Sequence, residues 1–254
     1  RAGMLDLPIH ERLERIFKDR YVGPGRLSEL VGLTSGAEEL EQIYRPLADL
    51  WATLMETEEL RPHVERNRIK TLQNTFADYA LILRLASVPG QRGADAQVPC
   101  NLHYLRHTFE PFFSAASERS LWYAGCDFYK AGIGQTHWAL VDRQYLNCTF
   151  KKPGIRLLMY ARANDLPTAQ VGQKSVVEDI YDRVMLSLST GERFFEDCNS
   201  MTRTSYRQGG KGSTKQVFVY EKDGTLRISG KKGSPHWRPG RPHWPGILPA
   251  VVFS

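Results

Sequence analysis

Apolar positions recur at helical spacing through the first part of the chain. In residues 8–17, Ile9, Leu13, Ile16 and Phe17 fall on one stripe, and this repeat predicts an amphipathic helix. Similar patterns predict further helices over residues 26–31, 37–55 and, in one or two pieces, 58–87. Pro46 is expected to kink the helix over 37–55. We therefore expect residues 1–88 to form an all-α module.

The pattern changes after residues 89–99, which are rich in Gly, Pro, Ala, Gln and Asp and are expected to form a linker. Apolar and aromatic runs predict strands over 120–129, 136–150 and 154–161. A helix is predicted over 176–188 with Ser175 as its cap, and a β-hairpin over 215–230 around Asp223-Gly224. The predicted fold class is α+β, with an α+β domain over 100–230 that contains an antiparallel sheet, and a tail over 231–254.

Charge is distributed unevenly along the chain. The whole sequence has 34 Lys and Arg against 28 Asp and Glu, for a net charge of +6. Residues 201–254 hold ten basic and two acidic residues, so they carry +8 and the first 200 residues carry −2. A basic segment of this kind favours an acidic partner. We expect that partner to be nucleic acid, DNA rather than RNA.

The tail adds aromatic residues to this charge, because Pro-His-Trp occurs twice, at 235–237 and 242–244. Indole rings among cations suit stacking on unpaired bases, although both Trp side chains could instead dock into the domain. The expected nucleic-acid-binding residues are Arg203, Arg207, Lys211, Lys215, Lys231, Lys232, Trp237, Arg238, Arg241 and Trp244.

A second cluster of chemically capable residues lies in 102–109. On a helix, His103, Arg106 and His107 would share one face, because positions i, i+3 and i+4 are neighbours there. A guanidinium matches a phosphate, and a neutral imidazole can move a proton near neutral pH. The segment is therefore a candidate phosphoryl-transfer site. The plainer interpretation is an amphipathic helix whose polar groups serve packing.

The letters His-x-Leu-Arg-His-Thr-Phe at 103–109 resemble the second conserved box of the tyrosine recombinases, the phage-integrase family. His137 followed by Tyr145 is similar to the later His and nucleophilic Tyr of that family. Its Thr-Gly-x-Arg turn is matched by 190–193, downstream rather than upstream of the box. The resemblance implies a DNA strand-transfer protein, active or inactive, in which Tyr145 attacks a phosphate held by His103, Arg106, His137 and Arg193.

Two other classes of function stay open. Cys100, His103 and His107 have spacing that could hold zinc in a structural module, with Cys126 as a fourth ligand. A bacterial effector or toxin enzyme domain acting on a protein or small molecule is the other alternative. No Walker loop or dinucleotide fingerprint occurs, so we expect no cofactor.

The sequence also bears on cellular location and oligomeric state, but with fewer signals. Four dispersed cysteines favour reduced thiols and a cytoplasmic location, with secretion as an effector the alternative. No apolar run approaches the roughly 18 residues of a membrane span, and we expect no membrane partner. The oligomeric state is left open.

Overall fold

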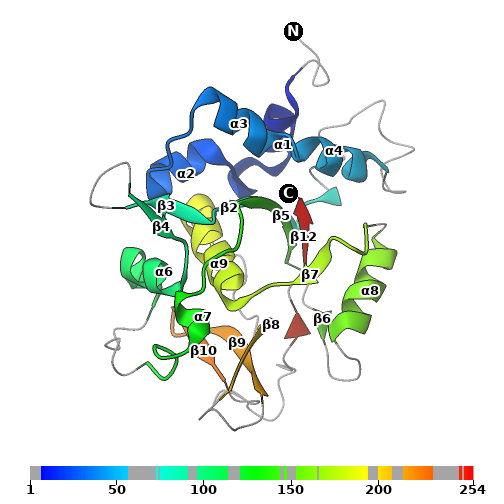
Figure 1. Ribbon diagram of the computed structural model, residues 1–254. Coiled ribbons are helices and arrows are strands. Elements are labelled where there is room, and N and C mark those ends of the chain that lie inside the picture. Colours follow the sequence, from blue (N-terminus) through cyan, green and yellow to red (C-terminus); the bar gives the residue numbers. More distant parts are fainter. Residues whose placement is uncertain are drawn as a thin grey trace.

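The fold consists of two five-stranded sheets with a long helix buried between them and a layer of helices on one outer side (Figure 1). The structure is a computed structural model. Its helices and strands confirm the predicted α+β class. The structure describes residues 7–56, 73, 75–90, 96–113, 121–143, 146–147, 153–164, 166–193, 200–207, 214–230, 246–247 and 249–253.

The first sheet has the order β1-β2-β5-β12-β7 and draws its strands from the whole length of the chain. Its strands are β1 (Tyr21–Val22), β2 (Tyr79–Arg84), β5 (His137–Asp142), β7 (Val171–Gln173) and β12 (Pro249–Phe253). β1 runs parallel to β2, and the other neighbours are antiparallel. The register of β2 on β5 places Arg84 opposite His137, which positions the polar site described below.

The second sheet has the order β10-β9-β8-β11-β6. Its strands are β6 (Leu146–Asn147), β8 (Ser200–Arg207), β9 (Thr214–Lys222), β10 (Thr225–Ser229) and β11 (Gly246–Ile247). Asp223 and Gly224 join β9 to β10 with φ angles of 50° and 78°. Two positive φ angles are what a type I′ hairpin turn requires, and the predicted hairpin is confirmed.

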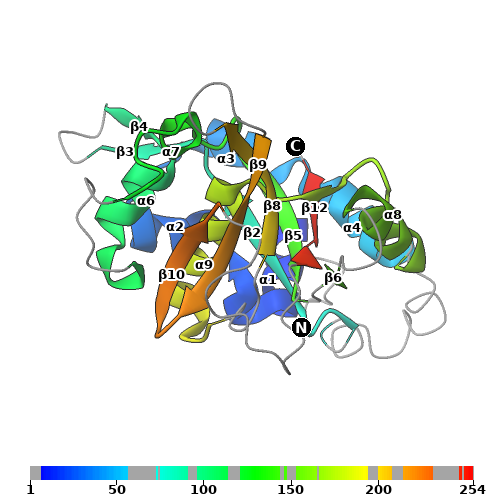
Figure 2. The ribbon, with the colours of Figure 1, turned by 90° about the horizontal axis from the view of Figure 1, so that it is seen from below.

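Helix α9 (Val176–Thr190) lies between the two sheets, and Figure 2 shows β8, β9 and β10 across it. A capping box begins the helix: Ser175 accepts a hydrogen bond from the Glu178 N–H, and Glu178 accepts one from the Ser175 N–H. Gly191 ends it with a φ of 73°. Every residue from Val176 to Leu186 is buried. The predicted helix and its cap are confirmed.

The helices before residue 57 cover the outer face of the first sheet (Figure 1). They are α1 (Ile9–Phe17), α2 (Pro24–Val31), α3 (Ala37–Tyr44) and α4 (Leu47–Glu56), with the 3-10 turn η2 (Lys18–Arg20) after α1. The expected helix over 37–55 is divided at Arg45 and Pro46, where proline supplies no N–H for an intrahelical bond. Trp138 of β5 anchors this layer by donating to the Ile43 carbonyl at 2.7 Å.

Shorter elements complete the fold. They are the ribbon of β3 (Ser87–Pro89) and β4 (Gln97–Pro99), α6 (Leu102–Thr108), η3 (Glu110–Phe112), α7 (Asp127–Lys130) and α8 (Pro153–Ala163). Among the residues that the structure describes, no helix is long and apolar enough to span a bilayer.

The expectation that residues 1–88 are all-α was wrong. All six residues of β2 are buried, because both faces of this strand are covered. A strand buried on both faces has an unbroken apolar run instead of alternation, and such a run cannot be told from a helix by period. β2 pairs with β5, which in turn pairs with β12. Strands from 1–88, 100–230 and 231–254 therefore share one sheet, and the expected linker does not separate two units.

Two further strand predictions were wrong. Residues 154–161 belong to α8, whose first position is Pro153 and whose interior is rich in Leu, Met, Ala and Arg, all good helix formers. Residues 121–126 form turns, and α7 follows them. In both segments the apolar content had predicted a strand, although Trp122 and Tyr123 lie in turns and Phe128 and Tyr129 lie in α7.

Candidate nucleic-acid interface and buried charge network

Helix α6 presents its polar face to solvent, as the sequence predicted. Asn101 caps the helix by accepting a hydrogen bond from the Tyr104 N–H at 2.8 Å. Leu102 and Leu105 are buried beneath it. His103 and His107 are therefore exposed, with their ring centroids 4.4 Å apart. The helix positions two imidazoles and the Arg106 guanidinium at one surface.

Aromatic residues of 121–130 pack against this helix. The Tyr129 hydroxyl lies 3.4 Å from Nδ1 of His103. Arg106 lies 5.5 Å from the ring centre of Phe113 and is hydrogen-bonded to Tyr123. Burial raises the pKa of Tyr123, although the positive charge of Arg106 acts to lower it. The Arg106 side chain is thus held by two aromatic rings.

A cluster of aromatic rings extends from α6 to the second sheet, and Trp122 and Tyr206 are its solvent-accessible members. The Trp122 side chain is 44% exposed, and its Nε1 donates to the Ile228 carbonyl at 3.1 Å. Its ring centre lies 4.9 Å from that of Tyr206 on β8. Trp122, Tyr123, Phe128, Tyr129 and Tyr206 contact one another ring to ring. Tyr123, Phe128 and Tyr129 are buried, so we call the two rings that reach solvent, Trp122 and Tyr206, the aromatic surface.

Basic residues of β8 and β9 lie beside this surface. Lys215 is directly opposite Tyr206 in the strand register, and Arg207 is exposed on the other face of β8, because side chains alternate along a strand. Arg203 is also exposed but donates to Glu178 at 2.9 Å. The remaining expected nucleic-acid-binding residues lie outside the described part of the chain: Lys211, Lys231, Lys232, Trp237, Arg238, Arg241 and Trp244.

His137 is buried on the side of β5 that faces α9. Its Nδ1 lies 2.8 Å from the Gln135 carbonyl, so we place the ring proton there. Nε2 then faces Nη1 of Arg84 at 3.5 Å and the Glu178 carboxylate at 4.0 Å. Burial and the charge of Arg84 lower the pKa of His137. The imidazole is therefore neutral near pH 7.

A network of buried charges surrounds His137, and the sequence did not predict it. Arg84 donates from Nε and Nη2 to the Asp182 carboxylate at 2.9 and 2.7 Å, and Lys174 Nζ lies 2.8 Å from the same carboxylate. Glu178 lies 3.6 Å from Arg84. Burial alone would raise the pKa of Asp182, but Arg84 and Lys174 outweigh it, and the pKa is lowered. This carboxylate is ionised inside the protein.

Asp179, one residue after Glu178, extends the network toward β8. It accepts hydrogen bonds from Ser200 and, at 3.4 Å, from Nε of Arg183. The pattern of α9 gives no signal for this burial. Its apolar residues, Leu186 excepted, lie on one half of the helix and the charges at 178, 179, 182 and 183 on the other, which is typical of a helix at the surface. The second sheet covers the charged half, so these charges are buried and have to be paired.

The expected zinc ligands are not brought together. Cys100 is fully buried, and burial raises its pKa to about 12, whereas His103 and His107 point to solvent. Among the described residues, no three His, Cys, Asp or Glu side chains form a group that could hold a metal ion. The cause is the cap at Asn101, which directs Cys100 inward just before the helix turns its histidines outward.

The expected strand-transfer residues lie in three different environments. His103 and Arg106 are on α6, His137 is inside the charge network, and Arg193 follows α9. Arg193 is paired with Glu221 and donates to the Gly224 carbonyl at 3.0 Å, so it closes the hairpin. Tyr145 lies outside the described residues. The side chains that were expected to hold one phosphate are therefore in different places, and His137 and Arg193 are bound to other partners.

No family model, no curated protein and no solved structure matches this chain.

Proposed function

We propose that the protein binds nucleic acid, with single strands preferred, through the aromatic surface and the cations beside it. The observation that carries the proposal is the exposed indole of Trp122. Its hydrogen bond to Ile228 and its contacts with Tyr123 and Tyr206 hold it in place. A fixed aromatic face at the surface offers a stacking partner to an unpaired base without a cost for ordering the side chain.

The charge around this surface has the sign that a phosphate backbone requires. Arg106 lies at the α6 end, beside the hydrogen-bonding groups of His103 and His107, and Lys215 lies opposite Tyr206 at the β8–β9 end. The most basic segment of the sequence begins immediately after Gly230, whose carbonyl accepts a hydrogen bond from the Tyr206 hydroxyl. Lys231 and Lys232 therefore follow, in the sequence, directly after a residue that is hydrogen-bonded to the aromatic surface. These features together support an aromatic platform within a cationic track.

The proposal covers binding and does not include strand transfer. His137 is buried with its free nitrogen turned to Arg84, and Arg193 is used by the hairpin. A reacting phosphate would have to displace both side chains from these partners. The resemblance to the recombinase box is then explained by an amphipathic helix that places two histidines and an arginine on one face.

Fluorescence anisotropy tests the proposal, with labelled oligothymidylate as the first probe and duplex DNA and oligouridylate as comparisons. Trp122→Ala should weaken single-strand binding by about 5- to 150-fold, the range for one lost stacking contact. Leu158→Ala is the matched control, because Leu158 is a similarly exposed apolar residue on α8. Lys215→Ala should lower the slope of log K against log salt by about one, whereas Arg207→Ala, on the other face of β8, should change it less.

Two results would contradict the proposal. Absence of binding to every probe at low salt would remove nucleic acid as the partner. Binding that is unchanged in Trp122→Ala would place the contact away from the aromatic surface. Circular dichroism of each variant provides the check that the fold is kept.

A further inference from the structure

Two exposed histidines lie one helical turn apart on α6. His103 and His107 are at positions i and i+4, which share one face of a helix. Their ring centroids lie 4.4 Å apart, with the ring planes at 68°. Both side chains are exposed, whereas Leu102 and Leu105 bury the other side of the helix. The helix therefore presents two imidazoles side by side to solvent.

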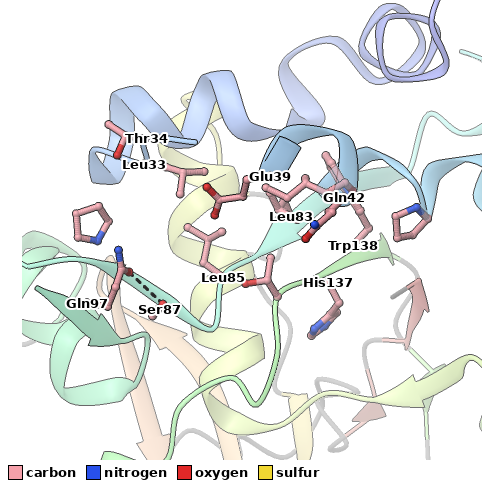
Figure 3. A pocket seen from close by; sticks show the side chains of 14 residues that line it. Leu33, Thr34, Glu39, Gln42, Leu83, Leu85, Ser87, Gln97, His137 and Trp138 are labelled. Carbon is pink, nitrogen blue, oxygen red and sulfur yellow. Dashed lines mark hydrogen bonds between the residues drawn. The ribbon is translucent and has the colours of Figure 1, made fainter. Parts of the chain in front are cut away.

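The other histidines that the structure describes are engaged elsewhere. His10 stacks on Tyr44, with ring centroids 4.2 Å apart and an interplanar angle of 9°. His137 is buried and bound through Nδ1 to the Gln135 carbonyl. Figure 3 shows its ring turned away from the cavity between α3 and the first sheet. Within the described part of the chain, α6 is therefore the place where two imidazoles meet.

The spacing of these two rings is close to what one metal ion requires. Zinc lies about 2.0–2.1 Å from a histidine nitrogen, and so about 3.2 Å from the ring centre. Two rings that bind one ion at an angle of about 90–110° then have centres about 4.5–5.2 Å apart. The observed separation is 4.4 Å. Small rotations of two exposed side chains therefore suffice to bring one lone pair of each ring to the same ion.

Neighbouring groups hold the helix and one of the rings in place. Asn101 caps α6 by accepting a hydrogen bond from the Tyr104 N–H at 2.8 Å. The Tyr129 hydroxyl lies 3.4 Å from Nδ1 of His103. A ring whose Nδ1–H donates to this oxygen has its lone pair on Nε2, and metal-binding histidines are generally oriented by such a second hydrogen bond. The frame exists before an ion binds, so little ordering of the chain opposes binding.

We propose that His103 and His107 bind one divalent transition-metal ion of the kind that prefers imidazole nitrogen, such as Zn²⁺, with water in the remaining coordination positions. Imidazole suits zinc, nickel and copper, whereas Mg²⁺ and Ca²⁺ take oxygen ligands. Two protein ligands make an exchangeable surface site, unlike the structural zinc site that the sequence predicted with Cys100. The bound ion adds positive charge beside Arg106. The site includes neither ring of the aromatic surface, and it does not depend on nucleic-acid binding.

Isothermal titration calorimetry of the whole chain with zinc chloride tests the proposal. Two ligands supply about half the binding free energy of a four-ligand zinc site, so the dissociation constant should be on the order of 1–200 µM. His103→Gln and His107→Gln should each weaken this binding by more than about tenfold, because one imidazole remains. Magnesium chloride should give no such binding. His10→Gln and Cys126→Ser are the controls, because both residues are partly exposed ligand types outside the pair.

A variant that keeps the number of histidines tests the spacing. In His107→Gln combined with Thr108→His, the second imidazole moves to position i+5, about 140° around the helix from His103. Thr108 is exposed at the end of α6, so the exchange leaves the buried side of the helix intact. Zinc binding should then be as weak as in His107→Gln alone.

Zinc binding that survives both single substitutions would place the ion elsewhere and overturn the proposal. Full affinity in the shifted variant would also overturn it, because the i, i+4 spacing would then have no role. Glutamine is a good helix former, and both histidines are exposed, so the single variants should keep α6. Circular dichroism of each variant checks this.

Discussion

Asp182→Asn is the substitution that tests the buried charge network most directly. The Asp182 side chain is fully buried and binds two nitrogens of Arg84 and the ammonium of Lys174. Asparagine keeps the shape but removes the negative charge, so two buried cations lose their shared partner. Breaking a buried ion pair in this way costs about 3–5 kcal/mol. That is a large fraction of the roughly 5–15 kcal/mol that stabilises a typical domain.

Urea and thermal unfolding measure this loss. For a chain of this length, the expected cost corresponds to a decrease in Tm of about 6–20 °C. Asp49→Asn is the matched control, because Asp49 is exposed in the first turn of α4 and its charge contributes less than about 1 kcal/mol there. The double variant Arg84→Met with Asp182→Leu should be less destabilised than Asp182→Asn, since it leaves fewer charges unpaired. A loss below about 1 kcal/mol for Asp182→Asn, or one equal to that of the control, would refute a tightly paired network.

Three further outcomes follow from the same contacts. The pKa of Glu178 is lowered because Arg84, Ser175 and Arg203 outweigh its burial, and burial lowers the pKa of His137. Below a pH of about 6.5 the unfolded chain therefore binds more protons than the folded chain. We expect the free energy of unfolding to fall steadily as the pH decreases from about 6.5 to about 4. Urea titrations at several pH values measure this change. Ser175→Ala removes one half of the capping box and should cost about 0.5–2 kcal/mol in urea unfolding. Cys100, whose pKa is about 12, should react with iodoacetamide far more slowly than the partly exposed Cys126 in the native protein, and mass spectrometry of the labelled peptides measures the difference.

Local signals in the sequence determined several elements. The Asp223-Gly224 pair required a turn with two positive φ angles, and no tertiary contact was needed to predict the hairpin. Ser175 marked the start of α9, and the stripe of Ile9, Leu13 and Ile16 marked α1. The polar face of α6 followed from helical spacing alone. The basic character of residues 201–254 is likewise a property of composition.

Tertiary structure decided the rest, because burial on both faces removes the periodicity that sequence patterns depend on. Residues 79–84 became β2 through pairing with β1 and β5, strands that lie more than 50 residues away in the chain. Residues 154–161 became α8 although their apolar content resembled a strand. His137 was expected at a phosphate, yet the register of β2 on β5 places it beside Arg84 under α9. Which polar residues meet depends on contacts between distant segments, and the sequence contains no local signal for such contacts.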